Sequence, residues 1–390
     1  MEILSGLVII FIACIIIWKA CDGFEDASGY LGRNMKGGVK GATIDAIGSS
    51  MPELFTTFFF LVLAGDAKGF ASGIGTTSGS AIFNIMIIPA AVIMSVIVVN
   101  RKVQYININP KVVLRDGIAL MLAILCLIIF VSETELDWYH GVFLMSLYVV
   151  YVLSLFFIKM DSEGDHDEEY EYEAGDGGRL AAFFKLDLSH AILGNNTMNS
   201  KRAWVLLILA TSIVGASCHL LVTGCELLGD GLNWNTYVVA LIFAAAATSV
   251  PDTIISVKSA NNGAYNDAIS NALGSNIFDI CFALGLPLTI YTLFYDKTII
   301  MSGGAEEMNF IGQFRILLLI MTFLATVIFY VGAKRKKLGA KSGYFLMLLY
   351  VAFIFYTLAY TYEAPWLQGV QDALININDH LVKLNPFHKM

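Results

Sequence analysis

The sequence predicts an all-α, polytopic membrane protein with about ten transmembrane helices arranged as two inverted five-helix repeats. Three observations support this fold class: an apolar composition, ten long apolar runs and an internal duplication. Of the 390 residues, 57% are hydrophobic and 14% are charged, with a mean hydropathy of +0.70. A soluble domain presents more charge than this to water, so the bilayer is the expected solvent.

The apolar runs are long enough to cross a membrane. A helix needs about 20 apolar residues to span a hydrocarbon core of roughly 30 Å. Ten segments meet this requirement, near Ile3–Trp18, Gly41–Ala64, Ser72–Val99, Val112–Val131, Gly141–Ile158, Ala203–Thr223, Thr236–Ala260, Ala268–Phe294, Phe310–Val331 and Gly343–Tyr362. The first lacks a basic region and a small-residue cleavage site, so we expect a retained span rather than a signal peptide.

The distribution of Lys and Arg predicts the orientation, because these residues are kept preferentially on the cytoplasmic side. Most of them follow the odd-numbered spans, whereas the opposite side carries only Lys68, Lys297, Arg315, Lys383 and Lys389. Both termini are therefore expected outside the cytoplasm, in a plasma or bacterial inner membrane. The expected divisions are a first repeat (1–158), an acidic cytoplasmic loop (159–202), a second repeat (203–362) and an extracytoplasmic amphipathic tail (363–390).

Two parts of the chain resemble each other. GATIDAIGSSMPELFTT (41–57) and GTTSGSAIFNI (75–85) correspond to FAAAATSVPDTIISV (243–257) and NALGSNIFDI (271–280). Cys14 and Cys21 recur as Cys218 and Cys225 with the same spacing. Each copy holds five spans, and this odd number forces the second copy to enter the membrane upside down. This is the plan of an inverted-repeat transporter.

Polar residues in the duplicated segments recur at helical spacing, and residues four apart share a helix face. These residues are Ser49, Glu53 and Thr57, their counterparts Thr248, Asp252 and Ser256, and the pairs Ser80 and Asn84, and Ser275 and Asp279. Calcium and sodium take oxygen ligands, and hydrocarbon supplies no water to replace missing ones. An intramembrane carboxylate costs at least about 2.5 kcal/mol, so the acids indicate function rather than helix packing.

A proline precedes an acid in each repeat. Pro52 stands before Glu53, and Pro251 stands before Asp252. Proline inside a helix cannot donate a hydrogen bond to the carbonyl one turn earlier. The carbonyls near Gly48 and Ala247 are therefore expected to be available to an ion.

These motifs carry a family resemblance. GSSMPE with GSAIFN in the first half, and TSVPD with SNALGSNIFD in the second, resemble the two repeats of the sodium/calcium exchanger superfamily of cation/calcium antiporters. The second half is most similar to the potassium-dependent branch. The resemblance implies that the partners are Ca²⁺ and Na⁺ ions and the lipid bilayer, and that no cofactor is needed. It implies ion binding by Ser49, Ser50, Glu53, Ser80, Asn84, Thr248, Ser249, Asp252, Ser275 and Asp279.

The expected function is exchange of Na⁺ for Ca²⁺ by alternating access, with K⁺ co-transport left open. Glu53 and Asp252 are the expected shared calcium ligands, and Asp279 belongs to the sodium sites. Because a buried carboxylate also binds protons, H⁺/Ca²⁺ exchange is the alternative, although hydroxyl ligands favour a metal ion. An enzyme is not expected, since an aspartyl hydrolase needs its acids in another context, and paired prolines suit a binding site better than a channel.

Other features are assigned no ion chemistry. Asp45 is expected to be a charge near the cytoplasmic interface, with a position on the access path as the alternative. The neighbouring Arg115 and Asp116 are expected as a pair near the inner surface. The acidic stretch 161–173 lacks the sixth-position Gly and closing Glu of a calcium loop, so it is expected to be solvated and disordered. The six cysteines lack zinc-site spacing. No basic patch interleaved with aromatics indicates nucleic-acid binding.

Overall fold

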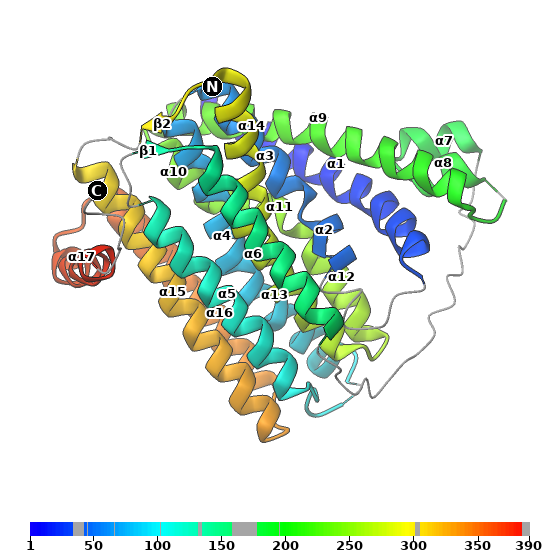
Figure 1. The fold of residues 1–390 in the computed structure, drawn as a ribbon. Helices are drawn as coiled ribbons and strands as arrows, with labels where there is room; N and C mark the ends of the chain where they lie inside the picture. The colour runs from blue at the N-terminus through cyan, green and yellow to red at the C-terminus, as the bar shows by residue number, and fades with distance from the viewer. Residues whose placement is uncertain are drawn as a thin grey trace.

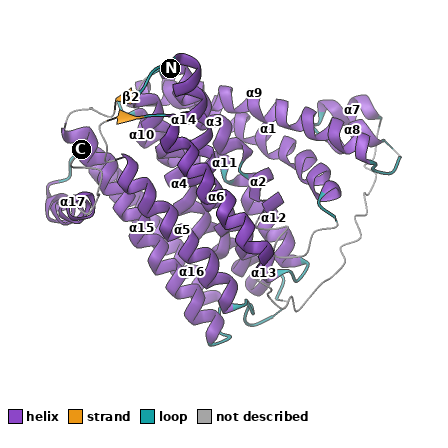
Figure 2. Cartoon of the chain, viewed as in Figure 1, coloured by secondary structure: helices purple, strands orange, loops and turns teal. Residues whose placement is uncertain are grey.

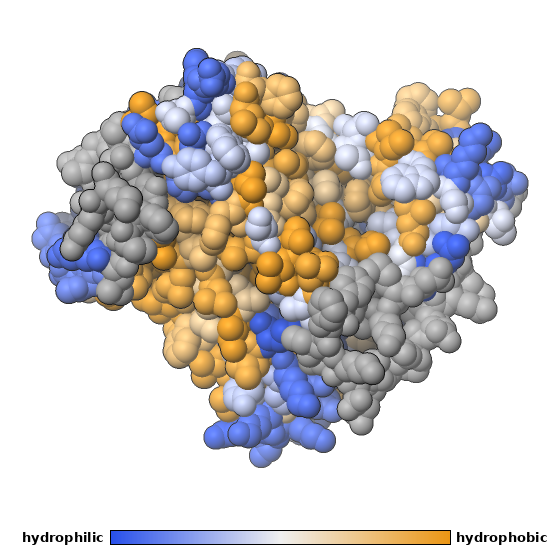
Figure 3. Space-filling model, viewed as in Figure 1, coloured by the Kyte–Doolittle hydropathy of each residue, from blue (hydrophilic) through white to orange (hydrophobic). Residues whose placement is uncertain are grey.

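The computed structural model describes residues 1–33, 43–44, 46–65, 67–101, 103–131, 135–157, 178–194, 196–300 and 305–383. Within these ranges, ten helical segments are long and apolar enough to cross a membrane. Figure 2 shows that helices dominate the chain. In Figure 3, an apolar band covers the middle of the molecule and hydrophilic residues gather towards its ends, as expected of a protein embedded in lipid. The predicted all-α membrane fold is confirmed.

The first repeat contains five spans, of which the second is broken and the third ends in a π-helix. A π-helix inside a span often marks a functional position. The elements are α1 (Glu2–Leu31), α2 (Ala46–Ser49) with α3 (Met51–Ala64), α4 (Ala67–Ile93) with η2 (Met94–Val99), α5 (Pro110–Val131) and α6 (Trp138–Phe157).

The second repeat follows the same order with the opposite direction through the membrane. Its second span is also broken, and its third span also contains a π-helix. The elements are α9 (Ser200–Leu232), α10 (Thr236–Val239) with η3 (Ala240–Ala244), α11 (Ala245–Thr248) and α12 (Val250–Asn261), α13 (Tyr265–Phe278) with η4 (Asp279–Ala283) and α14 (Leu284–Tyr295), α15 (Ala305–Lys334) and α16 (Ala340–Thr361).

The two first spans, α1 and α9, pack against each other and lie inclined to the remaining bundle (Figure 1). They contain 30 and 33 residues, more than a perpendicular span requires, and tilting accommodates such length. Small residues allow their close approach, since a Cβ atom on Gly6 would lie 2.9 Å from the Gly224 carbonyl oxygen. The pair has its own apolar core, and a larger core holds the other spans together.

Two ends of the molecule can be distinguished from contacts. At the terminal end, Ile3 lies against Gly231, and the rings of Trp234 and Tyr362 meet with centroids 6.0 Å apart. At the loop end, Lys258 of α12 forms a 3.1 Å salt bridge with Glu25 of α1. The two ends lie on opposite sides of the bundle, and their assignment to the outside and the cytoplasm stays a prediction.

The tail contains η5 (Pro365–Leu367) and α17 (Gln368–Lys383), which packs on α15 at the terminal end (Figure 1). Leu374 of α17 is buried, whereas Val370 and Ile377 are exposed. The segment predicted to be an amphipathic tail is therefore helical, and its apolar residues are divided between the contact with the bundle and the exposed surface.

Several elements were not predicted. Strands β1 (Glu135–Leu136) and β2 (Ile299–Ile300) form a short antiparallel pair between the two repeats. The predicted cytoplasmic loop contains α7 (Arg179–Phe184) and α8 (Leu188–Leu193). The acidic stretch 161–173 and Asp45 lie outside the described residues.

Candidate ion-binding site

The second span of each repeat is interrupted one residue before the Met-Pro or Val-Pro pair. Ser50 separates α2 from α3 with φ −93° and ψ 7°, and Ser249 separates α11 from α12 with φ −81° and ψ −1°. Proline occupies the second position of the helix that follows, where the missing N–H costs least. The same local sequence therefore produces the same helix break in both repeats.

The carbonyls near the breaks contact thiols. The Cys14 Sγ of α1 lies 3.9 Å from the Ala247 carbonyl oxygen, which Pro251 cannot reach with a hydrogen bond. In the other repeat, the Cys218 thiol donates to the Pro52 carbonyl at 3.5 Å. The duplicated cysteines thus bind α1 and α9 to the broken helices. The Ala247 carbonyl already contacts the Cys14 thiol, which is a weak donor. Its role as an ion ligand therefore stays a prediction.

Ser80 of α4 lies at the centre of the acidic cluster. Its Oγ is 3.0 Å from Glu53 Oε1 and 3.1 Å from Asp279 Oδ2. It is also 2.9 Å from the Ser249 hydroxyl, and it accepts a hydrogen bond from the Asn84 amide at 3.3 Å. One hydroxyl therefore joins two carboxylates that come from different repeats.

Asp252 of α12 completes the cluster with its own donors. Asn84 Nδ2 donates to Asp252 Oδ2 at 2.8 Å, and the Ser275 hydroxyl donates to Asp252 Oδ1 at 2.9 Å. Asn84 comes from the first repeat and Ser275 from the second. Both oxygens of Asp252 thus have partners, unlike those of the other two acids.

The structure brings all ten predicted residues into one region, and each is fully buried. The two broken helices face each other across the repeats, because Thr248 lies beside Glu53 while its counterpart Ser49 lies beside Asp252. Ser50 lies beside Asp279. Residues predicted from spacing on separate helices are therefore neighbours.

The hydrogen bonding of the cluster is incomplete. The Ser80 hydroxyl carries one proton, so it cannot donate to both Glu53 and Asp279 at once. Within the described chain, Glu53 Oε2, Asn84 Oδ1 and Asp279 Oδ1 accept no hydrogen bond. No described Lys, Arg or His side chain forms a salt bridge with the three acids. A cation or a proton would satisfy this arrangement, since uncompensated buried charge is costly.

Carboxylates alone do not form a metal cage here. Among the described residues, no group of three His, Cys, Asp or Glu side chains is arranged to hold a metal ion. A bound ion would therefore need the serine hydroxyls and the Asn84 amide oxygen as well. Such mixed oxygen ligands suit a hard cation.

Sequence reasoning missed a supporting set around the cluster. Asn271 donates to the Ser256 hydroxyl at 3.0 Å, and Asn276 donates to the Ala81 carbonyl at 2.9 Å. Both asparagines belong to the duplicated segment of the second repeat, so the duplication could have identified them as candidates. They fix α13 against α12 and α4, which carry the site residues.

Arg115 and Asp116 of α5 form the expected pair, with Arg115 Nε 2.6 Å from Asp116 Oδ1. However, Asp116 is fully buried in the protein, and it accepts hydrogen bonds from Ser270 at 2.7 Å and Tyr151 at 3.1 Å. The pair therefore joins α5 and α6 to α13 inside the bundle, a role that the sequence analysis did not predict.

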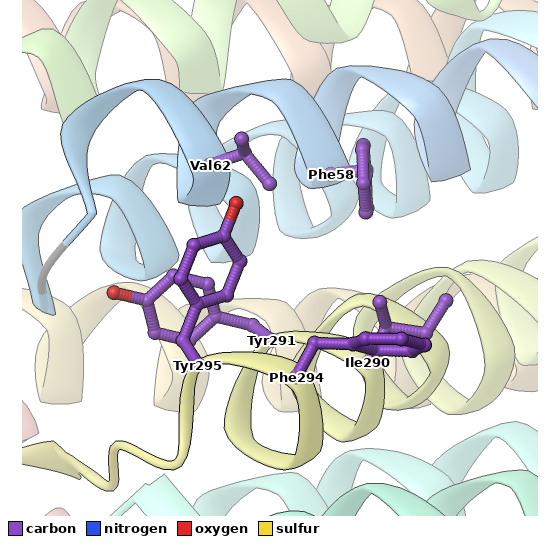
Figure 4. A pocket seen from close by; sticks show the side chains of 6 residues that line it. All are labelled: Phe58, Val62, Ile290, Tyr291, Phe294 and Tyr295. Carbon is purple, nitrogen blue, oxygen red and sulfur yellow. The ribbon is translucent and has the colours of Figure 1, made fainter.

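A separate groove of about 440 Å³ lies between α3 and α14. Figure 4 shows Phe58 and Val62 of α3 facing the α14 side chains Ile290, Tyr291, Phe294 and Tyr295. The Tyr291 hydroxyl donates to the Gly65 carbonyl at 2.7 Å. The lining contains no carboxylate, so this groove is not the candidate ion site.

The sequence matches the family described as sodium/calcium exchanger protein over residues 5–157 and 202–359. Human sodium/potassium/calcium exchanger 5 is 25% identical in an alignment of 441 positions that covers 92% of this chain and 84% of the relative. The Drosophila melanogaster sodium/potassium/calcium exchanger Nckx30C is 31% identical over 150 residues, covering 38% of this chain and 16% of the relative. For mouse sodium/potassium/calcium exchanger 4 the match covers 26% of the relative, so the chain spans only a small part of these two relatives.

Solved structures show the same fold. The structure of the sodium-calcium exchanger NCX_Mj, soaked with 10 mM Na⁺ and zero Ca²⁺, matches this chain with a TM-score of 0.53 at 22% identity. The match covers 90% of this chain and 98% of the NCX_Mj chain. The H⁺/Ca²⁺ exchanger CAX has a TM-score of 0.57 at 16% identity, with 98% and 90% covered. Together with the match across both repeats, these observations identify the chain as a member of the sodium/calcium exchanger protein family.

Proposed function

We propose that the protein is an antiporter that exchanges Na⁺ for Ca²⁺ at the cluster of Glu53, Asp252 and Asp279. One observation carries the proposal: carboxylates from both repeats meet through Ser80, buried and without a basic partner among the described residues. Inverted-repeat transporters place their ions at such an interface between repeats. Ca²⁺ or Na⁺ would be bound by the ten residues predicted from the motifs.

The excess charge favours exchange over leak. Occluding several unneutralised carboxylates in a medium of low dielectric constant is costly. Bound cations remove most of this cost, so the protein changes its open side only when loaded. If three Na⁺ move against one Ca²⁺, each cycle carries a net charge, and about 2.3 kcal/mol per charge per 100 mV adds to the driving force.

A proton is the competing counter-ion. A proton on Glu53 or Asp279 would also resolve their shared use of the Ser80 hydroxyl, so H⁺/Ca²⁺ exchange is the second candidate. The hydroxyl-rich lining favours Na⁺, because a proton needs no such set of ligands. Several relatives are named sodium/potassium/calcium exchangers, and K⁺ co-transport is therefore included among the alternatives to be tested.

The experiment is Ca²⁺ uptake into proteoliposomes containing the full chain, under a Na⁺, K⁺ or H⁺ gradient imposed in turn. We expect uptake driven by an outward Na⁺ gradient, and at least a tenfold loss in Glu53→Gln and Asp252→Asn. A K⁺ requirement on the Ca²⁺ side would identify co-transport.

The outcomes separate the candidates. Uptake that ignores Na⁺ but follows pH would replace the proposal with H⁺/Ca²⁺ exchange. Undiminished Na⁺-driven uptake in both variants would remove the site assignment while leaving the activity in place.

A further inference from the structure

The short helix α7 exposes its apolar side instead of burying it. Leu180, Phe183 and Phe184 are 77%, 44% and 83% exposed, whereas Ala182 on the other side is buried. The three exposed residues have the spacing i, i+3 and i+4, so they share one helix face. Figure 3 shows apolar residues beside hydrophilic ones on the right of the molecule, where Figure 1 places α7. An apolar face of this kind requires a partner.

The surroundings of α7 indicate which partner. The face lies at the loop end, close to the start of α9, where Trp204, Val205 and Ile208 are exposed on the surface that faces lipid. Trp is typical of the boundary between lipid and water. The apolar face of α7 therefore lies near the level of a membrane surface.

The charged residues near α7 indicate which kind of membrane surface the helix contacts. The sequence places Arg179 and Lys185 at the two ends of α7 and Lys201 and Arg202 at the start of α9, whereas the acids of residues 161–176 precede α7 in the chain. Apolar residues on one side and basic residues beside them are typical of helices that lie on anionic leaflets.

Helix α7 is linked to the site through α8 and α1. Arg179 donates to the Ile192 carbonyl and thereby joins α7 to α8. In α8, Ser189 donates to Asp26 of α1, and Leu188 packs on Gly23. This end of α1 borders a groove, too narrow for water, whose lining includes Asp22 and Pro251, and Pro251 adjoins the site residue Asp252.

We propose that α7 inserts its apolar face into the anionic cytoplasmic leaflet and that α8, carried by α7, clamps the loop end of α1. The clamp makes the position of α1 beside the groove depend on the lipid. The proposal rests on the predicted orientation and not on the identity of the transported ion, so it can fail independently of the proposed function.

The first experiment measures lipid contact. Phe184→Cys and the matched control Lys185→Cys, on the polar side of α7, are spin-labelled in the full chain and placed in phosphatidylglycerol or phosphatidylcholine nanodiscs. Wild-type protein labelled in parallel gives the background of the six native cysteines. Accessibility to oxygen and to a water-soluble nickel complex is compared. In phosphatidylglycerol we expect position 184 to favour oxygen and position 185 to favour nickel, and we expect the contrast to shrink in phosphatidylcholine.

Two results would overturn the proposal: equal nickel accessibility at both positions, or a contrast that is the same in both lipids. The second experiment tests the clamp by hydrogen exchange of the α1 segment 24–31. We expect faster exchange in the Leu180→Ser/Phe183→Ser/Phe184→Ser variant and in Ser189→Ala, with no change in Ala181→Ser, which alters an exposed α7 position outside the apolar face and the basic set. Unchanged exchange in the triple variant would disprove the coupling of α7 to α1.

Discussion

Ser80 is the residue through which the acids of the cluster meet. Its hydroxyl meets Glu53, Asp279 and Ser249 within 3.1 Å. A hydrogen bond to a charged group contributes about 1.5–3 kcal/mol. Substituting Ser80 therefore tests how much this one hydroxyl contributes to ion binding.

We predict that Ser80→Ala weakens Ca²⁺ and Na⁺ binding by about 10- to 100-fold, following the tenfold change per 1.4 kcal/mol. The matched control is Ser78→Ala, which removes a buried hydroxyl two residues away that has no hydrogen-bond partner within the described chain. Half-saturating concentrations for exchange measure both. Equal effects of the two substitutions would mean that loss of packing, not loss of a ligand, explains the change.

At the same scale, the sequence predicted which residues take part but not how they meet. The spacing of Ser49, Glu53 and their counterparts indicated shared helix faces, and the duplication indicated equivalent positions. Periodicity contains no distance between helices. The shared use of Ser80 by two acids, and the saturation of Asp252 by Asn84 and Ser275, were therefore not predictable.

Among the elements, the broken spans were predicted only in part: Pro52 and Pro251 indicated a lost backbone hydrogen bond in each second span, but the breaks at Ser50 and Ser249 were not predicted. The π-helices η2, η3 and η4 carry no comparable sequence signal, and they were missed. The element α8 was missed because a six-residue helix gives too few positions for a periodic pattern.

We predict that Pro251→Ala lowers exchange without lowering the thermal stability of the protein. Alanine supplies the missing N–H, and the interruption between α11 and α12 that positions Ser249 becomes a regular helix. The control is Pro287→Ala, which changes a proline inside α14 away from the acids. Exchange rate and melting temperature are measured together. Full activity of Pro251→Ala would show that the break is not needed.

The buried ion pair of α5 gives a prediction about stability. Removing Arg115 leaves the fully buried Asp116 carboxylate without a cation, so we expect Arg115→Met to cost roughly 3–5 kcal/mol in the free energy of unfolding. The double substitution Arg115→Met/Asp116→Leu should cost less than the single one, because it leaves no charge behind. Denaturant unfolding in one detergent compares them. A double variant less stable than the single variant would contradict this explanation.

For the whole molecule, the apolar runs predicted the number of spans and the duplication predicted their inversion, while the side of each end rests on the basic residues alone. We predict that Lys337→Cys reacts with an impermeant thiol reagent only from the cytoplasm, and Asp379→Cys only from outside. Both side chains are exposed, and wild-type protein controls for native cysteines. Labelling of both from the same side would show that the tail does not lie opposite the α15–α16 loop, and exchanged sides would reverse the orientation.

The most direct test of the account is equilibrium binding of radioactive Ca²⁺ to purified protein in the absence of any gradient. We predict saturable binding that Na⁺ displaces, that is lost in Glu53→Gln and in Asp252→Asn, and that persists in Ser78→Ala. Binding that survives both acid substitutions at unchanged affinity, in protein with an unchanged melting temperature, would contradict the claim that these buried carboxylates hold the ion.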